Sequence, residues 1–98
     1  MHAVNWKARA LADLAAILRK ISSGSSLGAE RLMRQVEART ALLLFHPQLG
    51  REGRQPGTRE LVIHRHYVMV YRIDGDRISI LRILHTARQW PPKIGFRR

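Results

Sequence analysis

The 98-residue sequence contains no cysteine, no long apolar run and few acidic side chains. The absence of cysteine excludes a disulfide framework, a thiolate metal site and a cysteine nucleophile. The longest apolar run, Ala41–Phe45, is far shorter than the roughly 20 residues that cross a bilayer. Met1–Trp6 also lacks the apolar stretch of a signal peptide. We therefore expect a soluble, cytoplasmic protein with no membrane contact.

The scarcity of acidic residues leaves the chain strongly positive. Lysine and arginine number 18 against seven aspartates and glutamates, which gives a formal net charge of +11. Most of the basic residues are arginines, whose planar guanidinium group suits bidentate recognition of phosphate or carboxylate. Such a field attracts nucleic acid or an acidic protein and steers association. The alternative explanation is a solvated basic surface that has no partner.

Two amphipathic helices are predicted in the N-terminal half. Apolar residues recur at spacings of three and four over residues 8–21 and again over residues 27–45. The serine-rich segment between them is expected to be a loop, and Ser25 or Ser26 can cap the second helix. Pro47 ends that helix, because the residue before a proline avoids the helical region. Two antiparallel helices joined by so short a turn form an αα-hairpin.

Strands are predicted in the C-terminal half. β-Branched and aromatic residues concentrate in residues 61–63, 68–71 and 78–84. Residues 74–76, Asp-Gly-Asp, are a hairpin signal, and residues 3–6 can add an edge strand. The expected fold class is therefore α+β, with the αα-hairpin packed on a three- to four-stranded antiparallel sheet. We expect residues 1–92 to form a single domain and residues 93–98 to be a basic, mobile tail.

The C-terminal half also contains an ordered series of short motifs. They are Gly50–Arg54, Pro56–Val62, Tyr67–Arg72 and Ile80–Pro91. In this order, after a helical hairpin, they resemble the RelE/ParE superfamily of type II toxins, nearer its ParE, or plasmid-stabilisation, branch, over residues 4–92. The resemblance implies a microbial RNase-like fold with a concave basic face. It also implies a growth-arresting toxin in a hetero-oligomer with a cognate antitoxin, whose acidic or amphipathic segment wraps the toxin.

The resemblance implies one of two kinds of target. RelE-type members cleave messenger RNA on the ribosome, whereas ParE-type members poison DNA gyrase. Relative to the RelE-type pattern, Val68 and Leu61 replace an arginine and a lysine, and Trp90 lies where a C-terminal tyrosine is expected. Arg59 and Arg88 do match basic positions of that pattern. Because tryptophan cannot act as an acid or base, these departures favour a target-binding, gyrase-directed toxin over an enzyme.

The residues expected at the functional site are mainly arginines. For a target-binding toxin we expect contacts through Arg51, Arg54, Arg59, Arg82 and Arg88. For the alternative, a ribosome-dependent mRNA endonuclease, the candidate catalytic residues are His85, Arg88, Arg82 and Arg59. His85 suits acid–base work because histidine has an ordinary pKa near 6.5. A further alternative is a non-toxic basic nucleic-acid-binding module, whose binding would weaken steeply with salt. No cofactor is expected in any of these cases.

Other conspicuous residues have simpler interpretations. His64 and His66 alternate on one strand face, which would suit a metal pair, but no third ligand is evident and no metal site is expected. Tyr67 and Tyr71 are four residues apart in a strand, so they share a face and are expected to pack in the core. Trp6 and Trp90 are likewise expected to cover the two ends of the core. The glycines before the first predicted C-terminal strand lack the Gly-Lys-Ser/Thr of a phosphate-binding loop.

Overall fold

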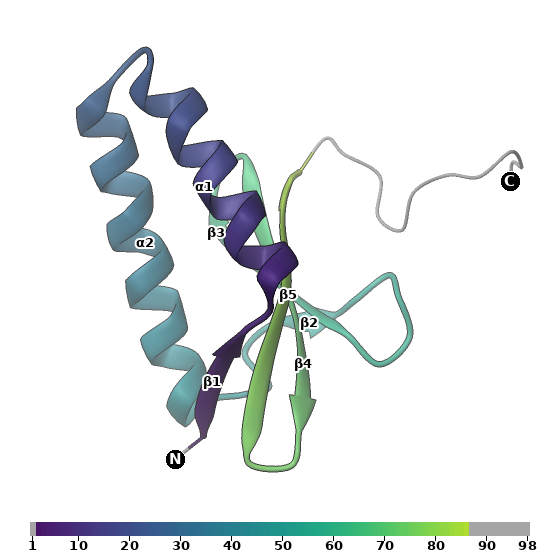
Figure 1. Cartoon of the computed structure of the whole chain (residues 1–98). Coiled ribbons are helices and arrows are strands. Elements are labelled where there is room, and N and C mark those ends of the chain that lie inside the picture. Colours follow the sequence, from purple (N-terminus) through teal and green to yellow (C-terminus); the bar gives the residue numbers. More distant parts are fainter. Residues whose placement is uncertain (1, 87–98) are drawn as a thin grey trace, which may run out of the picture.

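Two helices and five strands follow one another along residues 2–86, the part of the chain that the computed structural model describes (Figure 1). In chain order they are β1 (Ala3–Trp6), α1 (Ala8–Ser22), α2 (Ser26–Phe45), β2 (Arg51–Glu52), β3 (Arg59–His64), β4 (Tyr67–Asp74) and β5 (Arg77–His85). Both predicted helices, the three predicted C-terminal strands and the strand over residues 3–6 are confirmed. Arg88, Trp90 and the expected tail over residues 93–98 lie outside the described residues.

The sheet is mixed, with its strands in the order β1-β5-β4-β3-β2. It differs in two ways from the three to four antiparallel strands expected. First, β1 pairs parallel with β5, and strands paired in this way need a long connection between them, which the helices and the other strands supply here. Second, the extra strand β2 has only two residues, too few for any alternation of side chains to be recognised.

Local signals fix the turns that connect these elements. The Ser25 hydroxyl accepts a hydrogen bond from the Gly28 N–H at 2.9 Å, which confirms a serine cap on α2. That helix ends at Phe45, two residues before Pro47. Between β4 and β5, Gly75 has a φ of +62°, a conformation that glycine adopts without steric cost.

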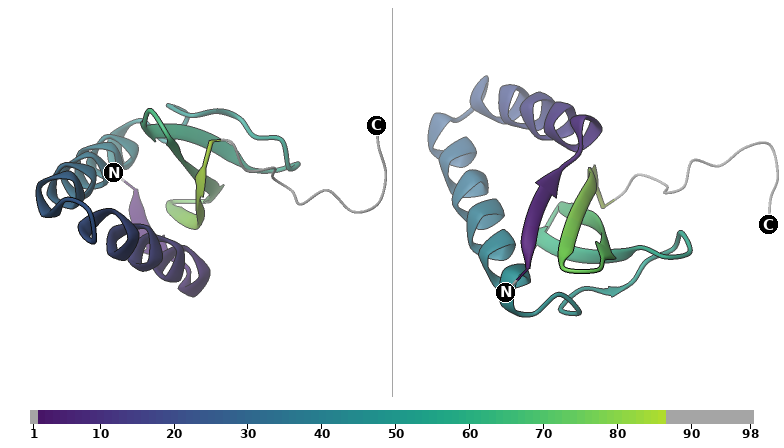
Figure 2. Two further views of the ribbon diagram at one scale, coloured as in Figure 1. Left: turned by 90° about the horizontal axis from the view of Figure 1, so that it is seen from above. Right: turned by 60° about the horizontal axis from the view of Figure 1, so that its bottom comes forward.

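The helices cover one face of the sheet, and the core lies between the helices and that face. α1 packs on β5, whereas α2 packs on β3 and β1, and Figure 2 shows both helices on the same side of the strands. The largest fully buried side chains of this core are Leu32, Leu43, Ile63, Met69, Tyr71, Ile78, Ile80 and Ile83. Tyr67 and Trp6 pack against the core while partly exposed, so the expected packing roles of Tyr67, Tyr71 and Trp6 are confirmed.

Candidate functional site

Two of the predicted arginines bind one buried carboxylate on β3, and a third lies beside it in the sequence. The Glu60 side chain is 1% exposed and accepts hydrogen bonds from Arg51 at 3.3 Å and from Arg54 at 3.0 to 3.2 Å. Arg51 lies directly opposite Glu60 in the pairing of β2 with β3. Arg59, the next residue along, donates to the Gly50 carbonyl oxygen at 2.7 Å. We call Arg51, Arg54, Arg59 and Glu60 the arginine cluster.

The arginine cluster keeps its positive charge at the surface. The side chains of Arg51 and Arg54 are 69% and 43% exposed even though both pair with Glu60. Burial raises the pKa of Glu60, but the hydrogen bonds from Arg54 and Arg51 more than offset this effect, and the pKa lies below its ordinary value. The carboxylate is therefore ionised at neutral pH. It holds guanidinium groups that can still meet an acidic or phosphate-bearing partner.

A hydrogen-bonded tyrosine holds the loop that precedes the arginine cluster. The hydroxyl of Tyr71, which is fully buried on β4, donates to the Pro47 carbonyl oxygen at 2.7 Å and accepts from the Gly50 N–H at 2.9 Å. Burial raises the pKa of this hydroxyl, so it stays protonated and able to donate. A side chain at residue 50 would collide with the Tyr71 ring, which explains a glycine here. The loop is thus fixed to the sheet before Arg51 begins β2.

Arg82 lies apart from the arginine cluster, where β5 meets α1. Its guanidinium group donates to the Asp13 carboxylate at 2.7 and 3.2 Å, and the same carboxylate accepts from the Ile83 backbone N–H at 3.0 Å. Arg82 and Asp13 are each only 13% exposed. Asp13 therefore ties α1 to β5 just beyond Trp6, where β1 ends. Little of the Arg82 side chain is left for contact with a target.

Three histidines and a tyrosine gather at the other end of the sheet, near the turn between β3 and β4. The His66 ring stacks on the His85 ring with centroids 5.6 Å apart, and it lies 5.8 Å from the His64 ring. Tyr67 meets His85 edge-on at 5.4 Å. Desolvation, followed by the positive charges of Arg65, His85 and His64, lowers the pKa of His66. We call His64, His66, His85 and Tyr67 the histidine cluster.

A small pocket of about 160 Å³ adjoins the histidine cluster. Its wall includes His85 and Tyr67 from the sheet and Lys20 from α1. Phosphodiester cleavage needs groups that transfer protons and a cation that stabilises the developing charge, and an imidazole beside an ammonium group can supply both. Not all of the candidate catalytic residues lie near His85, because Arg59 belongs to the arginine cluster. Arg88 lies outside the described residues.

Two further features of the described part of the chain concern possible metal ligands and the length of its helices. Within residues 2–86, no three His, Cys, Asp or Glu side chains are placed to hold a metal ion. No helix in that range is long and apolar enough to cross a membrane. The Nδ1 atom of His64 accepts a hydrogen bond from the His66 backbone N–H at 3.3 Å, so this nitrogen is occupied within the protein.

Three polar residues of these sites, Asp13, Lys20 and Glu60, were not predicted as site residues from the sequence. Glu60 had a recognisable signal, because it is an acidic residue at the start of an apolar strand in a chain with only seven acidic residues. Asp13 had none, since its partner Arg82 lies 69 residues away. Lys20 joins the pocket beside His85 only through the packing of α1 on β5. Pairings between distant segments leave no local pattern in a sequence.

Comparison with known proteins gives concordant matches. The family model described as the ParE toxin of the type II toxin–antitoxin system parDE matches residues 4–90. The putative toxin Y4kP of Sinorhizobium fredii is 35% identical over 89 residues, covering 90% of this chain and 92% of that protein. Toxin RelE2 of Caulobacter vibrioides is 38% identical over 88 residues, covering 90% and 99%. A structure of the chromosomal ParDE system of P. aeruginosa superposes with a TM-score of 0.75 at 27% identity, covering 87% of this chain and 96% of that one.

Proposed function

This chain belongs to the ParE toxin family of type II toxin–antitoxin systems, and we propose that it arrests growth by binding DNA gyrase and is neutralised by a cognate antitoxin. The match of the ParE family model to residues 4–90 carries this proposal. The similarity to a ParDE structure at 27% identity and a TM-score of 0.75 supports it. A toxin that works by binding needs an exposed recognition surface and no catalytic set.

The arginine cluster is the proposed target-binding surface. Arg51 and Arg54 are held in place by Glu60 yet keep 69% and 43% of their side chains exposed. Arginines restrained in this way lose little further side-chain entropy on binding, which favours affinity. Arg59 borders them on β3. Arg82 and Arg88 remain predicted contacts, Arg82 with only 13% of its side chain exposed.

The histidine cluster supports a second candidate function, a RelE-like endonuclease that acts on mRNA at the ribosome. The lowered pKa of His66 favours a neutral imidazole that can accept a proton at pH 7, and Lys20 and His85 share a pocket beside it. A relative at 38% identity also carries the name RelE2. This candidate ranks second because no tyrosine follows the last strand and Val68 stands where the RelE-type pattern has an arginine.

One pair of assays distinguishes the two candidates. The purified chain is added to DNA gyrase and supercoiling of a relaxed plasmid is measured, and in parallel it is added to translating ribosomes and the ends of the mRNA are mapped. We expect inhibition of supercoiling and intact mRNA. Cleavage within ribosome-bound codons, with normal supercoiling, would replace the proposal with the endonuclease. Growth that continues during induced expression would instead support a non-toxic nucleic-acid-binding module.

A further inference from the structure

The helix α2 carries apolar side chains on both of its faces. Leu32, Val36 and Leu43 are buried in the core, whereas Leu42 and Phe45 are 42% and 66% exposed. α1 and the sheet lie on one side of α2, and no other described element covers its outer side (Figure 1, Figure 2). A surface helix usually has one apolar face toward the core and polar side chains on the other. The exposed apolar residues of α2 therefore indicate a partner surface.

The outermost stripe of α2 consists of Arg34, Ala38, Ala41 and Phe45. Their spacing of four, three and four residues places them along one line of the helix surface, and all four are exposed. The stripe is symmetric about its own midpoint, with a small alanine on either side of that point and a large side chain at each end. When two such stripes run antiparallel, Ala38 faces Ala41 of the second copy, and Arg34 faces Phe45 of the second copy.

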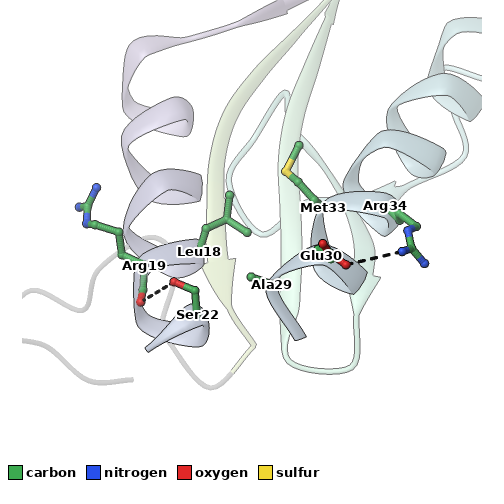
Figure 3. Close-up of a pocket in the computed structure, with 7 residues that line it drawn as sticks. All are labelled: Leu18, Arg19, Ser22, Ala29, Glu30, Met33 and Arg34. Atoms are coloured by element: carbon green, nitrogen blue, oxygen red, sulfur yellow. Dashed lines mark hydrogen bonds and ion pairs between the residues drawn. The ribbon is translucent and has the colours of Figure 1, made fainter. Parts of the chain in front are cut away.

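This antiparallel pairing is favourable both at the centre of the stripe and at its ends. The alanines at the centre allow the two helices to approach closely, because the side chains at a contact set the distance between helix axes. At each end a guanidinium group can lie over a phenyl ring, which attracts the cation. The present partner of Arg34 does not prevent this contact. Arg34 and Glu30 are 3.8 Å apart and 72% and 67% exposed (Figure 3), a geometry in which an ion pair contributes little.

A second copy of this chain suits the stripe better than an acidic protein or a nucleic acid does. Clustered positive charge attracts those partners, whereas the stripe has a single basic residue, Arg34. Each copy carries a formal net charge of +11, but physiological salt screens the repulsion between exposed charges beyond about 8 Å. A contact confined to one helix face of each copy is small, so we expect a weak dimer with a micromolar Kd.

We propose that α2 pairs antiparallel with α2 of a second copy through this stripe and forms a twofold-symmetric dimer, in which every contact is made twice. This inference does not depend on the proposed function. An open pocket of about 560 Å³, walled by His46–Leu49, lies just beyond the end of α2 and leaves room for the N-terminal half of the second copy's helix. In Figure 1 α2 lies on one side of the molecule and the loop between β2 and β3 on the other. The dimer therefore leaves the arginine clusters of both copies exposed.

The salt dependence of self-association is the first test. Analytical ultracentrifugation of the purified chain measures the Kd of the dimer at about 0.05 M and about 0.5 M NaCl. We expect the Kd to fall at least about threefold at the higher concentration, because salt screens the repulsion between two positive copies. A chain that stays monomeric throughout the micromolar range overturns the proposal. A Kd that rises with salt overturns it as well, since that is the behaviour of opposite charges that attract.

A substitution at the centre of the stripe tests its position. Ala38→Arg puts a long charged side chain where the two helices should approach most closely, and the matched control Ala15→Arg makes the same change at an exposed alanine of α1. Arginine and alanine both favour helix, so both variants should fold, which circular dichroism verifies. We expect the Kd of the dimer to rise at least about tenfold for Ala38→Arg and less than about twofold for Ala15→Arg. Equal effects of the two variants would reject this interface.

Cysteine cross-linking tests the direction of the pairing. The sequence contains no cysteine, so introduced thiols have no competing partner. In the antiparallel dimer position 34 meets position 45 of the second copy, whereas the two copies of either position lie about 16 Å apart along the helices. A disulfide spans at most roughly 7 Å between Cα atoms. Oxidation of a mixture of Arg34→Cys and Phe45→Cys should therefore give a cross-linked dimer. Cross-linking of either variant alone, or of neither sample, contradicts the proposed pairing.

Discussion

Glu60 is the residue on which the arginine cluster depends. The Glu60 carboxylate accepts three hydrogen bonds from Arg54 and one from Arg51. Replacing Glu60 by glutamine keeps the volume of the side chain but removes its negative charge. We expect Glu60→Gln to lower the free energy of unfolding by about 1.5 to 3 kcal/mol, the usual contribution of a hydrogen bond to a charged group. Urea denaturation at pH 7 measures this change. A loss below about 0.5 kcal/mol would mean that solvation of the exposed arginines replaces Glu60.

The contribution of Glu60 should also depend on pH. Its pKa is lower in the folded chain than the ordinary value of 4.5, so the folded state binds the proton less tightly than the unfolded state does. The stabilisation is then complete above pH 4.5 and is lost as the pH falls through the folded pKa. The stability gap between the wild type and Glu60→Gln should therefore narrow in urea titrations between pH 5 and pH 3. A gap that stays constant would show that Glu60 does not titrate in this range.

His66 gives a second pH dependence, nearer neutrality. Its pKa lies below the ordinary value of 6.5, so the folded chain resists protonation of this imidazole. Its favourable contribution is complete above pH 6.5 and declines as the pH falls further. We expect the chain to lose stability between pH 7 and pH 5.5, and His66→Gln to reduce that loss. An NMR titration of the histidine ring protons measures the pKa directly, and a value at or above 6.5 contradicts the prediction.

Some of these residue roles could be predicted from the sequence and others could not. Composition and resemblance indicated the arginines as candidate contacts and His85 as a candidate acid or base, and these roles stay predictions. Their partners were missed, because Glu60 and Asp13 become anchors only when strand pairing and helix packing bring distant residues together. Alternation along a strand did predict that Tyr67 and Tyr71 pack in the core. The sequence indicates which groups are present, and the fold decides which of them meet.

At the scale of elements, apolar spacing was sufficient for the regular segments but not for the irregular ones. The predicted helix over residues 8–21 is observed as Ala8–Ser22, and that over residues 27–45 as Ser26–Phe45. The parallel pairing of β1 with β5 had no local signal, since parallel and antiparallel partners present the same alternation in the sequence. The two-residue β2 is stabilised by its pairing with β3. These features depend on the whole sheet.

The contact between α1 and β5 makes a prediction at this scale. Asp13 receives Arg82 and the Ile83 N–H at a place where both charged side chains are 13% exposed. Removing the carboxylate takes away the acceptor of two hydrogen bonds from a largely buried guanidinium group and of one from the Ile83 N–H, so Asp13→Ala should cost about 2 to 4 kcal/mol of unfolding free energy. The control Asp76→Ala removes an exposed carboxylate and should cost less than about 0.5 kcal/mol. Equal losses by urea denaturation would show that Asp13 is not a specific link.

At the scale of the whole molecule, target binding can depend on the total positive charge of the chain or on the positions of particular arginines. Long-range attraction depends on the sum, +11, and falls with added salt. Recognition depends instead on guanidinium groups held where the target meets them. In this chain Glu60 restrains Arg51 and Arg54 at the surface, whereas Arg77, at the start of β5, is simply exposed. The two hypotheses therefore predict different effects for the same change made at the two sites.

Arg51→Gln and Arg77→Gln lower the net charge by the same amount, so they separate these hypotheses. If the position of the arginine governs binding, Arg51→Gln should raise about tenfold the concentration of the chain that inhibits gyrase supercoiling, as loss of a central interface arginine does. Arg77→Gln should leave that concentration nearly unchanged. Growth arrest at graded levels of induction should follow the same order. Equal effects of the two variants would mean that the total charge governs toxicity. The arginine cluster would then be one basic patch among several rather than the recognition surface.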